Sequence, residues 1–272
     1  EESTREALEE LSDRISTVAA ERVQDELRII LTDHQPARAL RLMDEIGLLA
    51  EVFPELEAAK GCEQPENYHP EGDVFVHTIL TVEKLGPYPS FSLAMAALLH
   101  DIGKAPANEG RDDLRFPEHE RMGAEMAERV CRRLRVPRAE TARIQWLVKR
   151  HMYFKDAEKM KDSTLKRLFA EPGFSELCQL VRADALASWG RFDNLEYVLK
   201  KREELIPEQI NPDPLIDGND LIERGYRPGP AFGTILERVR EKQLNGELSE
   251  REQALKEADR IAREIEAPRS SG

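Results

Sequence analysis

Histidine and aspartate side chains offer this sequence its most specific chemistry. The chain has six His, and four of them share helical faces with apolar residues at spacings of three, four and seven or eight. Two aspartates fall on apolar helical faces in the same way. The side chains that this pattern turns inward are His77, His100, Asp101, His119, His151 and Asp184.

A metal site accounts best for this set of inward side chains. One inward histidine is usually a satisfied core residue, and one inward aspartate is often a helix cap or an ion-pair partner. Two unpaired buried carboxylates would each cost roughly several kcal/mol, and the pattern places no inward Lys or Arg to neutralise both. Imidazole and carboxylate ligands suit Mn, Fe, Co, Ni or Zn better than Ca. The sequence therefore predicts divalent transition-metal binding, and its lack of clustered cysteines excludes a thiolate zinc finger.

The composition excludes several classes of protein. The chain has 272 residues, 40% of them hydrophobic and 34% charged, which is typical of a globular protein rather than a disordered one. Its net charge of −13 argues against a protein whose whole surface coats nucleic acid or an anionic membrane. The longest apolar run, residues 93–99, is far shorter than the roughly 18 residues of a membrane helix. With no secretion signal and three widely spaced cysteines, we expect a cytoplasmic protein without a membrane partner.

Helical periodicity dominates the chain and predicts an all-α fold. Residues 4–31 are expected to form one or two amphipathic helices, and Pro36 to begin another. At least five helices are expected between residues 68 and 189, and a charged helix over about residues 249–265. Both tryptophans, Trp146 and Trp189, are expected in the core rather than as platforms for base stacking.

A basic segment adds candidate substrate-binding residues. Residues 131–170 contain twelve Lys or Arg and four Asp or Glu, a local charge of +8. The segment is either a pair of solvated helix faces or a surface that attracts phosphate, and Lys149 and Arg150 lie in it beside an inward histidine. Lys104 follows the His-Asp pair and either contacts a substrate phosphate or is a solvated lysine. His69 precedes the first metal helix, where it either lines the entrance or is a loop residue without a role.

These residues carry a resemblance to a known superfamily. His77, then the adjacent pair His100-Asp101, then Asp184 on successive helices resemble the HD superfamily of metal-dependent phosphohydrolases. The segment Ile102-Gly103-Lys104 after the pair strengthens the likeness. The two further inward histidines resemble those of the members that hold two metals.

The resemblance implies two ions that share one carboxylate. The ligands would be His77, His100, Asp101 and Asp184 for the first ion, and Asp101, His119 and His151 for the second. A metal-activated hydroxide would attack phosphorus, with Asp101 and Lys104 as catalytic residues. The implied substrates are nucleotide or RNA-end phosphoesters, including 2′,3′-cyclic phosphates.

A second resemblance covers most of the chain. Residues 36–49, 53–56, 68–74 and 214–230 resemble the region that follows the catalytic head of bacterial tRNA nucleotidyltransferases and poly(A) polymerases. That head carries a Gly-Gly turn, and no Gly-Gly occurs here. Nucleotide addition is therefore not expected of this chain alone, and a separate nucleotidyltransferase head is an expected partner. Because the sequence opens on Glu1 and not Met, it fits an excised or independently evolved C-terminal half.

The second resemblance implies three parts. They are a helical neck or body segment at 1–66, a multi-helix HD phosphohydrolase domain at 67–205 and a C-terminal helical extension at 206–272. Two functions follow. One is an enzyme that hydrolyses phosphoesters. The other is the tRNA-binding C-terminal part of a tRNA nucleotidyltransferase, with a vestigial or structural metal site and a catalytic head that is absent or on another chain. A vestigial site would be expected to have lost ligands, so the six intact positions favour the enzyme.

Overall fold

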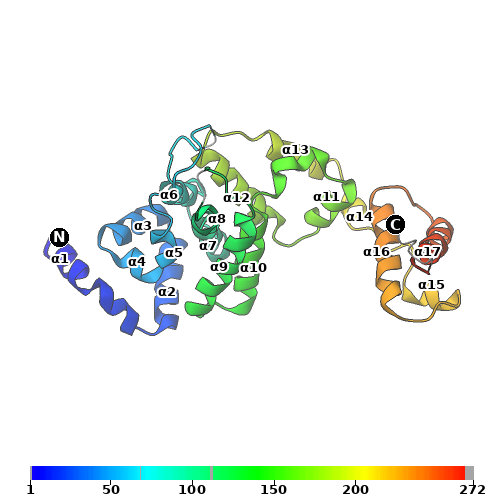
Figure 1. Cartoon of the computed structure of the whole chain (residues 1–272), viewed down its shortest axis with the longest axis horizontal. Helices are drawn as coiled ribbons and strands as arrows, with labels where there is room; N and C mark the ends of the chain where they lie inside the picture. Colours follow the sequence, from blue (N-terminus) through cyan, green and yellow to red (C-terminus); the bar gives the residue numbers. More distant parts are fainter. Residues whose placement is uncertain (1, 68, 111–112, 267–272) are drawn as a thin grey trace. The chain divides into compact units, whose positions relative to one another are not determined.

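The computed structural model describes residues 2–67, 69–110 and 113–266. Seventeen α-helices and two 3-10 helices occupy these residues, and the only strand-like pairing among them is one bridge between Glu63 and Asp73 (Figure 1). The predicted all-α fold is therefore confirmed. Tyr68 of the resembling segment 68–74 and the last residues of the predicted C-terminal extension lie outside the described residues.

The chain forms two compact units. The first contains residues 1–155 and 175–196, and the second contains residues 156–174 and 197–272. Their boundaries fall within the 3-10 helix η2 (Tyr153–Lys159), at the first residue of α12 (Phe174–Ala187) and within helix α13 (Asp193–Glu203). The sequence predicted three parts, at residues 1–66, 67–205 and 206–272. Their boundaries differ from those of the two compact units, and the three-part division remains a prediction.

Short helices open the first unit. They are α1 (Glu2–Leu11), η1 (Ser12–Thr17), α2 (Ala20–Leu31), α3 (Pro36–Glu45), α4 (Leu48–Val52) and α5 (Pro54–Glu57). The expected amphipathic segment 4–31 is thus divided into α1, η1 and α2, and Pro36 is the first residue of α3, as predicted. Gly47 takes a left-handed φ of +73° between α3 and α4, a conformation that suits glycine. Helix α3 packs against α6, which joins these helices to the core of the unit.

Helix α7 (Phe91–Leu99) is the centre of the first unit, and all of its residues are buried. It packs against α6 (Val74–Lys84), α9 (His119–Arg133) and α10 (Arg138–Arg150), as Figure 1 shows. Side chains cap two of these helices: Asp73 accepts a hydrogen bond from Val76 N, and Ser90 accepts one from Leu93 N. Helix α7 ends at Leu99, so the His-Asp pair directly follows this fully buried helix.

Two more helices complete this unit: α8 (Lys104–Asn108) and α12 (Phe174–Ala187). Helix α12 buries one apolar face and then ends near Gly190, which has a left-handed φ of +66° and donates a hydrogen bond from its N to Ala185 O at 2.7 Å. Trp189, in this turn, is 56% exposed, so its expected core position was wrong. Trp146 is half-buried.

The second unit has its own core. Its helices are α11 (Asp162–Phe169), α14 (Pro207–Ile210), α15 (Gly218–Glu223), α16 (Pro230–Leu244) and α17 (Arg251–Glu266). The core residues of this unit are Ile216, which lies between α14 and α15, and Leu221, Ile235, Val239, Ala254, Ala258, Ile261 and Ala262 from the helices. The charged helix expected over about 249–265 is α17, which packs along α16. Within the described part of the chain, no helix has both the length and the apolar character needed to cross a membrane.

Candidate metal centre

Five helices of the first unit bring the six inward side chains together. His77 lies in α6, and His100 and Asp101 directly follow α7. The other three come from the start of α9, the end of α10 and the last turns of α12: they are His119, His151 and Asp184. The four histidines and Asp101 are buried, and the Asp184 side chain is 21% exposed. Periodicity thus predicted the inward faces, and the fold joins those faces at one centre.

The first cluster surrounds Oδ2 of Asp101. His100 Nε2 lies 3.2 Å from this oxygen, and His77 Nε2 lies 3.7 Å from it. The two Nε2 atoms are 3.3 Å apart. Asp184 Oδ1 completes the cluster at 3.0 Å from His77 Nε2. His77, His100 and Asp184 present three potential ligand atoms that lie within 4.8 Å of one another, and Asp101 Oδ2 lies beside the two histidines.

The second cluster surrounds the other oxygen of the same carboxylate. Asp101 Oδ1 lies 3.4 Å from His119 Nε2 and 3.6 Å from His151 Nε2. The two imidazole nitrogens are 3.2 Å apart. Asp101 therefore faces one cluster with each of its oxygens, the arrangement expected of a bridging ligand.

The ring orientations fit metal ions. The Nδ1 atoms of His100, His119 and His151 lie 2.7 to 2.9 Å from the backbone oxygens three residues earlier, so each Nδ1 is the hydrogen-bond donor and each Nε2 carries a lone pair. The lone pairs of His119 and His151 face each other at 3.2 Å, which is unfavourable unless a cation or a proton lies between them. Asp101 Oδ1 is buried and accepts no hydrogen bond, a state that usually costs free energy. An ion in each cluster would satisfy these atoms.

The electrostatics of the first cluster favour positive charge. Burial would lower the pKa of His77, but Asp184 and Glu71 outweigh it and raise that pKa to about 9. Burial would raise the pKa of Asp184, but the neighbouring His77 holds it well below its usual value. The proton on His77 thus occupies the place where a bound cation would interact with the same carboxylate.

Two ligands of the second cluster, His151 and Asp101, are held in the protonation states that metal binding needs, whereas burial of His119 is outweighed by Asp101, which raises the pKa of His119. Burial, helped by the neighbouring His100, lowers the pKa of His151 to about 3, so its imidazole is neutral. Burial opposes ionisation of Asp101, but His100 and Lys104 keep its pKa well below the usual value. A neutral imidazole and an ionised carboxylate are the forms that bind divalent metals.

Glu71 is a functional candidate that the sequence reasoning missed. Its side chain is only 5% exposed, and Oε1 lies 2.5 Å from Nδ1 of His77 and 3.0 Å from Nδ1 of His69. A carboxylate at Nδ1 favours the tautomer in which Nε2 of His77 is free to bind metal. Helical periodicity could not reveal this contact because Glu71 lies in the loop before α6. The only signal was its position two residues after His69.

The predicted substrate-binding residues fall in different places. His69 lines the cavity above the centre, and so does Lys104. The Lys104 ammonium lies 2.6 Å from Asp101 Oδ2 and 2.5 Å from Gln64 Oε1. Because Lys104 is only 5% exposed, the alternative of a solvated surface lysine was wrong.

Lys149 and Arg150 do not line that cavity. Lys149 is exposed in a separate hollow beside Glu118 and Glu120. The guanidinium of Arg150 lies 4.8 Å from the centre of the Trp146 ring, a cation–π contact. The structure thus places neither residue beside the metal centre, and their role in substrate binding stays a prediction.

The cavity that opens on the centre has a volume of about 820 Å³. Its walls include four of the six inward residues: Asp101, His119, His151 and Asp184. Besides Lys104, three cations line it: Arg115, Lys155 and Arg191. A cavity that joins potential metal ligands to cationic walls suits a phosphate-containing ligand.

The basic segment is not one surface of one unit. Residues 131–155 belong to the first unit and residues 156–170 to the second. Many of its cations also have carboxylate partners: these are Arg132, Arg133, Arg143, Lys159, Lys161 and Arg167. The +8 segment was expected to be either a pair of solvated helix faces or a surface that attracts phosphate. Most of its cations are paired or solvated, and Lys155 is the one cation of this fully described segment that lines the cavity.

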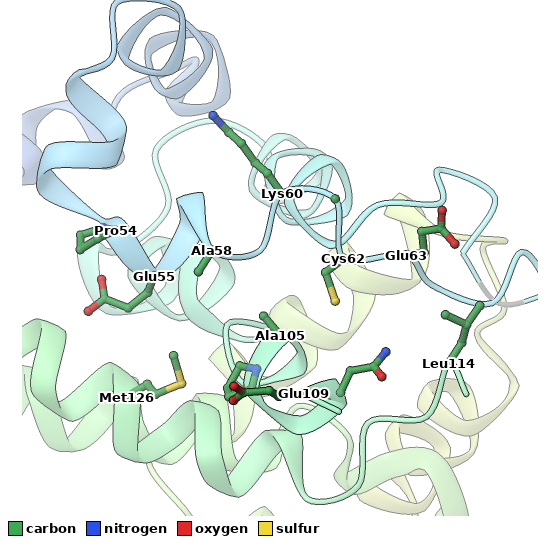
Figure 2. A pocket seen from close by; sticks show the side chains of 13 residues that line it. Pro54, Glu55, Ala58, Lys60, Cys62, Glu63, Ala105, Glu109, Leu114 and Met126 are labelled. Atoms are coloured by element: carbon green, nitrogen blue, oxygen red, sulfur yellow. The ribbon is translucent and has the colours of Figure 1, made fainter. Parts of the chain in front are cut away.

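A second cavity of the first unit has a volume of about 890 Å³ and no histidine in its walls (Figure 2). Its Lys60 ammonium points away from the other lining side chains in Figure 2 and pairs with Asp44 and Glu57 at 2.6 and 2.7 Å. Its Glu55 carboxylate binds Arg133. Two of its charged side chains are thus paired locally, and because it holds no histidine, the cavity over the metal centre is the better candidate for metal-dependent chemistry.

Comparison with protein families identifies the class of this site. The HD domain family matches residues 76–189, which include all six inward residues. The family described as "Probable RNA and SrmB- binding site of polymerase A" matches residues 1–60. The chain therefore contains an HD domain preceded by a segment of this RNA-binding family, and the predicted resemblance is confirmed.

Similar curated proteins are tRNA nucleotidyltransferases. The CC-adding tRNA nucleotidyltransferase of Thermus thermophilus is 30% identical over 243 residues, which cover 87% of this chain and 55% of that protein. The A-adding tRNA nucleotidyltransferase of Deinococcus radiodurans is 32% identical over 271 residues, 92% of this chain and 60% of that protein. The Multifunctional CCA protein of Alkalilimnicola ehrlichii is 36% identical over 157 residues, which cover 57% of this chain and 37% of that protein. The chain thus spans little more than half the length of the first two relatives.

Proposed function

We propose that this chain is the tRNA-binding part of a tRNA nucleotidyltransferase system. The observation that carries the proposal is the similarity to nucleotidyltransferases along almost the whole chain, together with the RNA-binding family over residues 1–60. In this proposal a nucleotidyltransferase head, on the same protein or on a separate chain, supplies nucleotide addition.

Three exposed arginines of residues 1–60 are candidates for phosphate contacts. Arg14, Arg22 and Arg38 are exposed, and no carboxylate lies within ion-pair distance of them in the described part of the chain. Arg41, by contrast, pairs with Glu83. Because the net charge of the chain is −13, binding to tRNA depends on such local unpaired cations.

We expect the chain to bind tRNA with an affinity that falls linearly with salt on a double-logarithmic plot. Replacing Arg14, Arg22 and Arg38 together by alanine should weaken binding and reduce the slope by about one for each phosphate that the variant no longer neutralises. Filter binding over a salt series measures both quantities, and Arg41→Ala is the matched control. Failure to bind tRNA even at low salt would exclude this function, and an unchanged slope in the triple variant would exclude these arginines.

A second function, phosphoester hydrolysis at the HD centre, is favoured by one specific observation. All six ligand positions are intact, and Asp101 turns one oxygen to each cluster. Bound divalent ions, Mn, Fe, Co, Ni or Zn, would polarise a phosphoryl oxygen and lower the pKa of an attacking water. Lys104 holds the Asp101 carboxylate in place, and the cavity cations would orient an anionic substrate. The proposed substrates are nucleotide or RNA-end phosphoesters, including 2′,3′-cyclic phosphates.

Hydrolysis should depend on metal. Protein freed of ions with a chelator and then dialysed should not hydrolyse bis-(p-nitrophenyl) phosphate or uridine 2′,3′-cyclic phosphate, and adding Mn, Co, Ni or Zn should restore both activities. Metal analysis of the same samples should give up to two ions per chain. Inactivity of protein that contains two ions would leave tRNA binding as the sole function and the centre as structural.

A further inference from the structure

Trp189 presents a fixed aromatic face to solvent. The residue is 56% exposed, although the indole is among the most apolar surfaces a chain can bury. Its Nε1 donates a hydrogen bond to the backbone oxygen of Glu66 at 3.2 Å. The one polar atom of the ring is thus bound to the protein, which fixes the ring while leaving its apolar surface open.

The turn that carries Trp189 adjoins the wall of the cavity over the metal centre. Ser188 and Arg191, close to Trp189 on both sides in sequence, line this cavity. Pro65 also lines it, next to the residue that accepts the indole hydrogen bond. Both ends of the indole contact therefore adjoin residues of the cavity wall.

Unpaired positive charge lies in the wall of this cavity, and one of its cations, Arg191, is two residues from Trp189 in sequence. Arg191 and Lys155 are exposed and line the cavity, and among the described residues no carboxylate lies within ion-pair distance of either side chain. The Asn194 side chain donates a hydrogen bond to Lys155 O at 3.0 Å and so holds the backbone beneath one of these cations. An open aromatic face beside unpaired cations is the combination that binds single-stranded nucleic acid.

We propose that Trp189 and Arg191 form a subsite for the second nucleotide of a single-stranded RNA 3′ end, with the base on Trp189 and its phosphate on Arg191. The proposal rests on the proposed hydrolase, whose cavity would take the terminal nucleotide. A cavity of about 820 Å³ lies within the range of small-ligand sites, so it is large enough for the terminal nucleotide, and the proposal places the next nucleotide on Trp189. The natural substrate would then be an RNA end rather than a free mononucleotide.

Two substrates with the same reacting group test the subsite. They are uridine 2′,3′-cyclic phosphate and a five-nucleotide RNA that ends in uridine 2′,3′-cyclic phosphate. Trp189→Ala should lower kcat/KM for the RNA relative to kcat/KM for the mononucleotide by about fivefold or more, mainly through a higher KM for the RNA. The reason is that stacking of one base on an aromatic ring raises affinity by about fivefold or more. Trp189→Phe should restore most of the ratio. Leu186→Ala, which removes another exposed apolar side chain of α12, should leave the ratio unchanged.

A binding measurement keeps the subsite testable if the proposed hydrolysis fails. Trp146 and Trp189 are the two tryptophans of the chain, so Trp146→Phe makes Trp189 the reporter. Adding the five-nucleotide RNA with a 3′-phosphate should quench its fluorescence, and Arg191→Ala should weaken this binding. Quenching without hydrolysis would retain the subsite and reject the hydrolase. An unchanged substrate ratio in Trp189→Ala together with no quenching would overturn the subsite. This is also the result expected if the exposed Trp189 face binds a protein partner instead of RNA.

Discussion

Replacing Asp101 with alanine should remove both bound ions and lower phosphodiester turnover by at least about a thousandfold, or about 4 kcal/mol in activation free energy. The reason is geometric, because Oδ2 faces His77 and His100 while Oδ1 faces His119 and His151. No other residue of the centre contacts both clusters in this way. The measurement is metal content by mass spectrometry, made with turnover of bis-(p-nitrophenyl) phosphate on the same sample.

Two companion variants separate the loss of the bridge from general damage. Asp101→Asn keeps the volume of the side chain but removes its charge, and it should behave like the alanine variant. Asp25→Asn, at an exposed carboxylate far along the chain from the centre, should leave metal content and turnover unchanged. Circular dichroism should show an intact helical fold in all three, since apolar burial supplies most of the stability. Near-normal turnover with two ions in Asp101→Ala would disprove the bridge.

The ligand set could be predicted because helices make inward faces periodic. His77, His119 and His151 each repeat with apolar neighbours every three or four residues, and the structure buries all three. The joint occurrence of several such residues pointed to metal where each one alone pointed to the core. The inward-facing side chains of the α-helices were therefore predicted well.

Several side chains in loops and near helix ends were not predicted, for physical reasons. Glu71 lies in a loop, where sequence spacing does not determine which way a side chain points. Trp189 follows α12 in a turn with a left-handed glycine, so the apolar periodicity of the helix no longer applies there. Lys149 and Arg150 adjoin His151 in sequence, but successive helical residues are rotated by about 100°, and this directs them away from the cavity.

The position of His119 depends on a glycine that the sequence reasoning treated only as part of a motif. A Cβ atom built on Gly103 would lie 2.2 Å from the backbone oxygen of His119 and 2.6 Å from Gly123 N. Both contacts are with backbone of α9, which cannot move aside as a flexible side chain can. The absence of a side chain at Gly103 is thus what lets the segment after Asp101 approach the start of α9.

Gly103→Ala should therefore destabilise the fold by about 1–3 kcal/mol or more, because the added methyl group overpacks a backbone contact. It should also weaken binding of the second ion selectively, by about tenfold or more, since the displaced His119 belongs to that cluster and to no other. Urea unfolding followed by circular dichroism measures the first effect, and titration of metal-free protein with Mn or Co measures the second.

Gly233→Ala is the matched control for this substitution. Gly233 lies in α16, where an added Cβ meets nothing within 4 Å, so alanine should stabilise that helix by about 0.5–1 kcal/mol. Opposite signs for the two glycine replacements would show that the approach of α9 to Gly103, and not the loss of glycine as such, causes the destabilisation. If Gly103→Ala retained full stability and bound both ions as tightly as the unaltered chain, the contact with α9 would have no part in placing His119.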